Sequence, residues 1–405
     1  MKFFFDFEAS VPALRRDIEI IVFTGKEGDN QLYMNCPHGY ADALTLPATF
    51  SPLLELINGS NSIFSITAQL SQTTTLRVQP ADLSVFLRDL DELGFLQTST
   101  FYRRKEEIQR FRASQIRPAI CAGGAYPSTV RELTEYLDEI MRTSPVRENP
   151  ARGIIAPHID LRVGGTAYSP AYNAISQSEA DLFVIFATSH YANYDLFIPT
   201  FKDFETPLGI VETDRELLEA IRGSFPFDLT TNDIAHKPEH SIELELIFLQ
   251  HCFSRRNFTI LPILVTSFHS FIQQGILPEQ HPPVKEFAAA VRTVVEQSGR
   301  NAIYISSGDL AHIGRKFGDT FDAEPILPAL HTEDNSLLRS LELCDHNGFF
   351  THVAKTNDKW KICGLSPNYM MLETMRPERG EILYYEQWNE REQKSAVSYA
   401  SLAFY

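Results

Sequence analysis

Residues 182–190 read LFVIFATSH, an apolar run of strand length that ends at His190. Short apolar runs of this kind are typical of strands buried on both faces of a parallel sheet. GIIAPHID, residues 153–160, has the same form and brings His158 after its apolar part. The two runs predict two parallel strands, each followed by an imidazole.

A third run, AIYISSGDLAH at residues 302–312, delivers Asp309 and His312. In open α/β sheets, ligands bind at the carboxyl ends of the strands, so three runs that end in imidazole or carboxylate predict one shared metal-binding cleft. If a helical turn follows the third strand, Asp309 and His312 share one face of it and can bind metal or act as acid and base. Cys363, in KICG, is the fourth candidate, because a thiolate at a helix N-terminus is a good soft ligand.

Each candidate also has a simpler structural explanation. A single strand-end histidine is more often a buried side chain bonded to a carbonyl, and Asp309 can serve as a helix N-cap. An isolated Cys363 is most simply an inert buried thiol. The repetition of the pattern at His158 and His190 favours the metal site.

The segment PEHSIELEL supplies a further candidate, His240. Pro238 is expected near a helix start, so His240 and Glu243 should project from neighbouring positions. We expect His240 either to orient a metal ligand or to contact substrate. Glu239 and Glu243 can simply favour the positive N-terminus of the helix.

The composition limits the classes of function. With 405 residues, 43% hydrophobic and 22% charged, the chain has room for two or three domains. A formal net charge of −16 disfavours nucleic acid and anionic membranes as partners, and the basic cluster Arg103–Lys105 is followed at once by two glutamates. No stretch approaches the roughly 20 apolar residues of a membrane helix, and MKFFFDFE at the N-terminus lacks a signal-peptide core.

Cysteine usage points to a reducing compartment. The five cysteines, at positions 36, 121, 252, 344 and 363, form no C-x-x-C pair and are odd in number. We therefore expect a cytoplasmic protein.

Three segments are expected along the chain. Residues 1–100 predict a small α+β domain, residues 101–116 a charged linker, and residues 117–405 one long α/β domain. In the last segment, strand-like runs alternate with helical stretches, which predicts a mostly parallel central sheet flanked by helices on both faces. Its strands are expected at Ile154, 182–188, 259–265, 302–306 and 397–404, and its helices at 129–142, 213–222, 240–252 and 284–297.

The first segment has the pattern of a winged-helix domain. Two short strands precede three helices, with Ser51, Asn61 or Ser62, and Pro80 expected at the helix starts and a last strand at Phe95. Winged helices often bind DNA, but this segment carries six Lys and Arg against twelve Asp and Glu, which would repel a phosphate backbone. A protein or peptide partner, or a plain dimerisation or packing role, is expected instead.

Seven ordered blocks resemble the MEMO family over residues 117–405. They are AGGAYPSTVRELTEYLDEI, IIAPHIDLRVGGTAYSPAY, ATSHY, EHSIELEL, SSGDLAHIGRKF, KICGLSP and VSYASLAFY. In the first segment, LLELINGSNSIFSITAQL with LSVFLRDLDELGFL is similar to PqqD-like domains, which recognise leader peptides in ribosomal peptide maturation.

The MEMO resemblance implies a fold like that of the class III extradiol (LigB-type) dioxygenases. It implies metal ligands at His158, His190 and Cys363, and a cleft lined by Asp309, His312 and His240. The bacterial and archaeal family members also imply two partners, an AMMECR1-like protein and a radical SAM enzyme.

The chain departs from the family pattern around the cleft. Ile159–Arg162 replace the usual Ala-Gly-Tyr and aromatic stretch, Tyr191 stands where a second histidine often follows, and Gly124–Tyr126 replace Ser-Trp-Tyr. These changes alter the wall and the charge of the pocket, so a family substrate is not expected to carry over.

Three functions fit these residues. The first is an iron- or copper-dependent, dioxygenase-like redox enzyme with a His2Cys site and His312 as acid or base. Because Cys363 is softer than the carboxylate of the ring-cleaving relatives, it shifts metal preference and puts extradiol cleavage in doubt. The second is a metal-containing module that presents a peptide to a radical SAM partner, and the third is a zinc hydrolase.

Overall fold

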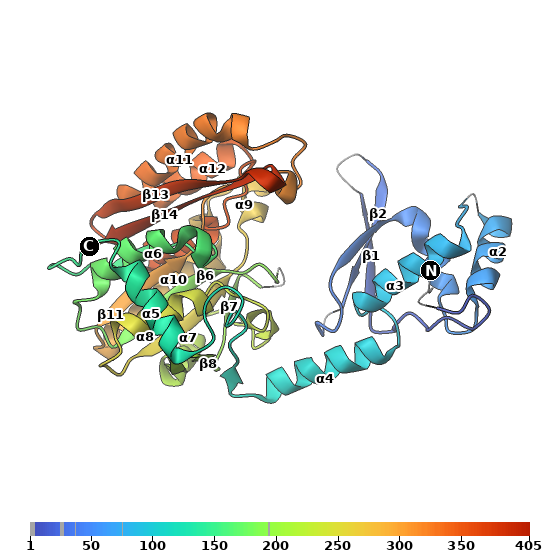
Figure 1. The fold of residues 1–405 in the computed structure, drawn as a ribbon, viewed down its shortest axis with the longest axis horizontal. Coiled ribbons are helices and arrows are strands. Elements are labelled where there is room, and N and C mark those ends of the chain that lie inside the picture. The colour runs from blue at the N-terminus through green and yellow to red at the C-terminus, as the bar shows by residue number, and fades with distance from the viewer. Residues whose placement is uncertain (1–4, 25–27, 37, 75, 193–194) are drawn as a thin grey trace. The chain divides into compact units, whose positions relative to one another are not determined.

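The computed structural model describes residues 5–24, 28–36, 38–74, 76–192 and 195–405. The first half of the N-terminal octet MKFFFDFE lies outside these residues. The chain forms two compact units, Met1–Ala113 and Ser114–Tyr405 (Figure 1). Most of the segment expected as a linker is helix α4 (Ser99–Ala113), which groups with the first unit and buries Phe101, Ile108 and Phe111.

The described part of the first unit contains a three-stranded antiparallel sheet and four helices. The strands are β1 (Glu19–Thr24), β2 (Asn30–Asn35) and β3 (Leu44–Pro47), and the helices are α1 (Ser51–Leu56), α2 (Ile63–Thr73), α3 (Pro80–Glu92) and α4. As predicted, the Ser62 side chain caps α2 by accepting from the Ser65 amide, and α3 begins at Pro80.

Two local predictions for this unit are wrong. Ser51 is the first residue of α1 and not its N-cap, a position held by Phe50. The strand expected from Phe95 is an isolated bridge between Leu96 and Leu14. Gly94 turns the chain sharply out of α3 with a φ of 87°, and the two residues after it enter the core directly, fully buried.

A large, mostly parallel sheet forms the centre of the second unit (Figure 1). Among the described residues its order is β12-β14-β5-β11-β6-β10-β9-β8-β4, with β13 paired to β14 and β7 to β10. Strands β5, β11, β6 and β10 run parallel, whereas β12, β13 and β14 form an antiparallel end. The strands are β4 (Ile116–Arg117), β5 (Gly153–Ala156), β6 (Leu182–Thr188), β7 (Phe197–Pro199), β8 (Asp203–Thr206), β9 (Gly209–Thr213), β10 (Thr259–Val265), β11 (Ala302–Ser307), β12 (His312–Gly314), β13 (Gly380–Glu390) and β14 (Ser395–Phe404).

Helices cover both faces of this sheet, as predicted. Alternate β6 residues belong to different cores: Val184 lies in one with residues of α7, α10 and α13, and Ile185 lies in the other with residues of α5, α6 and α8. The helices are α5 (Val130–Met141), α6 (Leu161–Ile175), α7 (Arg215–Ser224), α8 (Glu243–Cys252), α9 (His269–Gln274), α10 (Pro282–Ser298), α11 (Leu327–Glu342), α12 (His346–Lys355) and α13 (Leu365–Met375).

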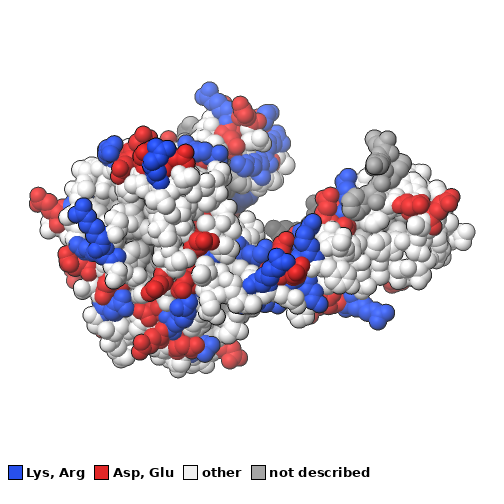
Figure 2. All heavy atoms as spheres, turned by 60° about the horizontal axis from the view of Figure 1, so that its bottom comes forward, with Lys and Arg blue, Asp and Glu red and all other residues white. Residues whose placement is uncertain are grey.

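The surface mixes both signs of charge. On the face drawn in Figure 2, Lys and Arg side chains lie among Asp and Glu side chains, and on α4 Arg110 pairs with Glu106. Within the described ranges, no helix combines the length and the apolar character that crossing a bilayer requires.

A buried ion pair ties β4 to α8. The guanidinium of Arg117 contacts the carboxylate of Glu243, and both side chains are fully buried. Arg117 Nε also donates to the carbonyl of His236 at 3.0 Å, and Glu243 accepts from the Cys121 amide at 2.9 Å and from the Tyr126 hydroxyl. Because the remaining polar atoms of both ions are used in this way, removing either partner leaves an uncompensated buried charge.

Replacing Arg117 with Met should therefore lower the free energy of unfolding by about 3–5 kcal/mol. Arg131→Met is the control, because Arg131 pairs with Glu135 across an exposed turn of α5 and such pairs contribute about 0–1 kcal/mol. Urea unfolding followed by far-UV circular dichroism measures both changes. Equal losses in the two variants would contradict this account of the buried pair.

Glu245, two residues further along α8, is buried and forms no ion pair with any residue that the structure describes. It accepts from the Tyr172 hydroxyl at 2.5 Å, and its Oε1 has no hydrogen-bond partner among the described residues. Burial raises the pKa of Glu245 to about 8. Its carboxyl group is therefore protonated in the folded protein at neutral pH.

The substitution Glu245→Gln should make stability less dependent on pH. Between the pKa of the unfolded chain and about 8, only the unfolded wild type releases the Glu245 proton, so its stability falls as pH rises. The variant has no such proton to release. Its free energy of unfolding relative to that of the wild type should therefore rise by at most about 1.4 kcal/mol per pH unit between pH 5 and 8. Unfolding curves at several pH values test this, and a constant difference would show that Glu245 is ionised when folded.

Candidate metal centre

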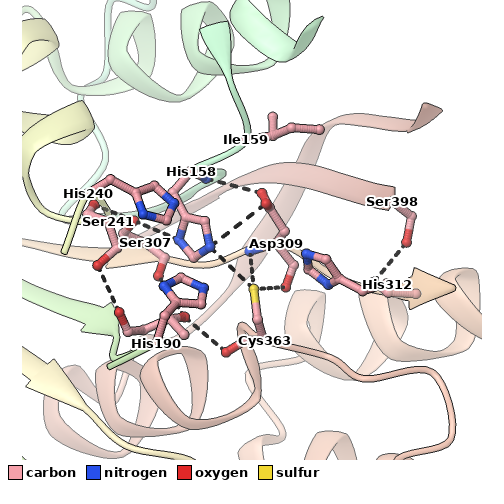
Figure 3. Close-up of polar contacts among 12 residues, drawn as sticks. His158, Ile159, His190, His240, Ser241, Ser307, Asp309, His312, Cys363 and Ser398 are labelled. Carbon is pink, nitrogen blue, oxygen red and sulfur yellow. Dashed lines mark hydrogen bonds and ion pairs between the residues drawn. The ribbon is translucent and has the colours of Figure 1, made fainter. Parts of the chain in front are cut away.

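Three of the predicted residues follow parallel strands by the same interval. His158 is the second residue after β5, His190 the second after β6, and Asp309 the second after β11. Because these strands are parallel neighbours, with the end of β6 offset by one residue from that of β11, the three side chains come out at one edge of the sheet. Figure 3 shows them converging with Cys363, which enters from the loop before α13.

The three candidate ligand atoms lie close together. Cys363 Sγ lies 3.3 Å from His158 Nε2, and the ligand atoms of His158, His190 and Cys363 all lie within 4.8 Å of one another. Bonds of about 2.0–2.3 Å to a tetrahedral ion place ligand atoms roughly 3.3–3.8 Å apart. The structure thus brings together the three residues for which the sequence predicted metal ligation.

Two glycines allow the Cys363 loop to approach β11. A Cβ on Gly308 would lie 2.5 Å from the Gly364 Cα, and a Cβ on Gly364 would lie 2.6 Å from the carbonyl oxygen of Asp309. The Asp309 amide points at Cys363 Sγ at 3.3 Å. Burial raises the pKa of the Cys363 thiol, so the thiolate needs a nearby cation.

His190 is held by Glu239, a residue that the sequence analysis assigned to a helix N-terminus. Helix α8 begins only at Glu243, which leaves Glu239 outside the helix. Glu239 Oε1 lies 3.0 Å from His190 Nδ1, and Oε2 accepts from the His190 amide at 2.7 Å. Burial opposes ionisation of both groups, but their mutual contact prevails, raising the pKa of His190 and lowering that of Glu239 to about 2.

The helical turn on which Asp309 and His312 would share one face does not form. Asp309 lies in a loop and His312 opens β12, because the chain continues into antiparallel pairing with β14. Asp309 Oδ1 accepts from the His158 amide at 3.1 Å, so it is not an N-cap. Burial raises the pKa of Asp309 to about 7 and lowers that of His312 to about 4, and a ligand atom of each lies within 4.8 Å of Cys363 Sγ.

His240 lies beside the cluster although the predicted helix start at Pro238 is wrong. Its ring stacks on that of His190 with centroids 5.0 Å apart, and lies 5.2 Å from the His158 ring. Burial lowers the pKa of His240. The side chains of His190 and His240 are each about a third exposed, so these two imidazoles border the open side of the site.

The donor set fits a metal ion. Two imidazoles and a thiol converge, while burial disfavours the ionised forms of Cys363 and Asp309. A divalent ion at the cluster would stabilise both anions. Nitrogen and sulfur ligands suit iron, copper or zinc and disfavour magnesium or calcium.

The chain is similar to proteins of a known family. Residues 117–403 match the family described as Memo-like protein. A MEMO1 family protein of Aquifex aeolicus is 30% identical over 87% of this chain and 90% of its own length. Residues 117–403 make up less than 87% of the chain. The similarity to the Aquifex aeolicus protein therefore also includes part of the first unit.

More distant relatives cover mainly the second unit. A MEMO1 family protein of Methanosarcina barkeri is 28% identical over 70% of this chain and 98% of its own length. The memo-1 homolog of Caenorhabditis elegans is 27% identical over 76% of this chain and 87% of its own length. The chain therefore belongs to the MEMO family.

Proposed function

We propose that this chain is a metal-dependent oxidoreductase in which His158, His190 and Cys363 hold an iron or copper ion. The observation that carries the proposal is the convergence of two imidazoles and one thiol within 4.8 Å at the carboxyl edge of the sheet. Such an ion, when bound, would supply one-electron or oxygen-dependent chemistry. The residues of the chain would bind the ion, orient the substrate and transfer protons.

Asp309 and His312 are the proposed acid–base pair. With a pKa raised to about 7 by burial, Asp309 can both hold and release a proton near neutral pH. His312 Nδ1 lies 3.1 Å from the Lys361 carbonyl and can only donate to it, so the other ring nitrogen is free to accept a proton. His240, on the open side, would contact the substrate.

The thiol also argues against ring cleavage as the reaction. We propose a LigB-like arrangement for the second unit from its family resemblance, but the ring-cleaving relatives place a carboxylate where this chain has Cys363. A thiolate is a softer and more electron-rich ligand, which favours a different metal and a different redox potential. A redox reaction other than extradiol cleavage fits this donor better.

The proposal predicts near-stoichiometric iron or copper in anaerobically purified protein. His158→Ala, His190→Ala and Cys363→Ser should each lose most of this metal, because two remaining ligands bind weakly. His352→Ala and Cys344→Ser are matched controls, because they remove the same types of side chain at positions outside the cluster. His352 on α12 pairs with Glu333 on α11, and Cys344 lies just after α11. Mass spectrometry of bound metal tests the set.

Zinc in place of iron or copper would contradict the redox assignment and favour a hydrolase. Full metal content in the Cys363→Ser variant would contradict the site itself.

A second role, binding of a protein or peptide by the first unit, is favoured by strand β1. Ile20, Ile21, Val22 and Phe23 are 43%, 52%, 64% and 41% exposed, and among the described residues β1 pairs with β2 alone. An apolar strand with one free edge can accept an extended partner strand. We propose a PqqD-like peptide- or protein-binding role for this unit, with a radical SAM enzyme and an AMMECR1-like protein as partners.

Val22→Lys should weaken binding to the purified partner at least tenfold, because a charge on β1 opposes burial of its apolar side chains. Val85→Lys is the control, since Val85 is 48% exposed on α3 of the same unit. Biolayer interferometry with the radical SAM enzyme and the AMMECR1-like protein measures both variants. If Val22→Lys bound both partners as tightly as the parent does, β1 would not be part of the interface.

A further inference from the structure

Three buried hydroxyl groups connect the segments that carry the ligands. Ser307 Oγ, at the end of β11, donates to the Ser241 carbonyl at 2.7 Å. Ser241 Oγ donates to the Thr188 carbonyl at 2.8 Å, and Thr188 Oγ1 donates to the Cys363 carbonyl at 2.9 Å. The three side chains are buried, so water cannot replace these bonds. The hydroxyl chain thus runs from the His158 side of the site to Cys363.

Ser307 also contacts the ring of His158. Its Oγ lies 3.3 Å from His158 Nδ1. A serine hydroxyl has one proton, and the Ser241 carbonyl, 2.7 Å from Ser307 Oγ, can only accept it. The Ser307 oxygen is therefore an acceptor for His158, and His158 Nδ1 carries the proton.

This arrangement determines which ring nitrogen can bind a metal. With the proton on Nδ1, the lone pair of His158 is on Nε2, the atom 3.3 Å from Cys363 Sγ. The other tautomer would put an N–H on Nε2 and bring two lone pairs together at Ser307. His158 is 3% exposed, so water cannot relieve such a mismatch.

The two metal-binding histidines have different partners on their second nitrogen. Glu239 holds His190 Nδ1 with a carboxylate, whereas a neutral hydroxyl holds His158 Nδ1. Partners of this kind normally fix the tautomer and the ring orientation of a metal-binding histidine. Neither contact is predicted by the sequence pattern, because each partner lies far from its histidine along the chain.

We propose that Ser307 and Thr188 are positioning residues that prepare the metal centre, Ser307 by presenting the Nε2 lone pair of His158 and Thr188 by fixing the backbone of Cys363. The inference rests on the proposed metal site and extends it to two residues that do not touch the ion.

Ser306 provides a matched control on the same strand. It is as fully buried as Ser307 and loses the same hydroxyl on substitution by alanine. Its Oγ donates at 2.6 Å to Oδ1 of Asn368 on α13, whereas Ser307 contacts Ser241 and His158. A general effect of disturbing β11 would appear equally in Ser306→Ala and Ser307→Ala.

Cobalt titration of the full chain tests the inference, with Co²⁺ as the probe and the visible and thiolate charge-transfer absorption as the readout. We expect Ser307→Ala to bind Co²⁺ about 10–100-fold more weakly, with an altered spectrum, and Ser306→Ala to match the parent. Thr188→Val keeps the shape of the side chain and should also weaken binding, with a change in the thiolate band. Thermal unfolding of the metal-free variants reports any loss of folding separately.

Equal losses of Co²⁺ affinity in Ser306→Ala and Ser307→Ala would contradict the positioning role. Co²⁺ affinity equal to that of the parent in both Ser307→Ala and Thr188→Val would contradict it as well. Neither result would contradict the metal site. A parent chain that binds no Co²⁺ would overturn the metal site itself, and the positioning role with it. The two failures are therefore distinguishable.

Discussion

The parallel alignment of β5, β11 and β6 is the constraint on which the site depends. Neighbouring parallel strands end at the same edge, and a side chain two residues beyond each end enters one small volume. His158, Asp309 and His190 all occupy that position. The sheet can hold this register because alternate side chains of its strands are buried in separate cores on its two faces.

Burial gives these groups their chemistry. In water, Asp309 would be ionised and His312 would titrate near neutrality, but inside the fold the pKa of Asp309 rises to about 7 and that of His312 falls to about 4. Glu239 has an equally buried site yet stays ionised, because it contacts His190. The site therefore combines groups whose charged forms are disfavoured by burial with one fixed anion, Glu239, beside His190.

The sequence predicted the central elements well where a strong pattern existed. Strands β6 and β10 begin and end at the predicted residues, and the structure places His158, His190 and Cys363 close together. Strand β13 was not predicted, because its polar and aromatic residues lack the apolar run of a buried strand. The helix start predicted at Pro238 was wrong, and the helical turn considered at Asp309 does not form, because the loops there make hydrogen bonds to residues distant in sequence. Glu239, Ser307 and Thr188 were missed for the same reason, since their partners lie 49 to 175 residues away in sequence.

X-ray absorption at the zinc edge of the zinc-loaded chain tests most directly whether His158, His190 and Cys363 bind the same ion. The account predicts one sulfur scatterer at about 2.3 Å and at least two imidazole nitrogens at about 2.0–2.1 Å, with the sulfur absent in Cys363→Ser. A first shell without sulfur in the parent protein would contradict the account, because the ion would then bind away from Cys363.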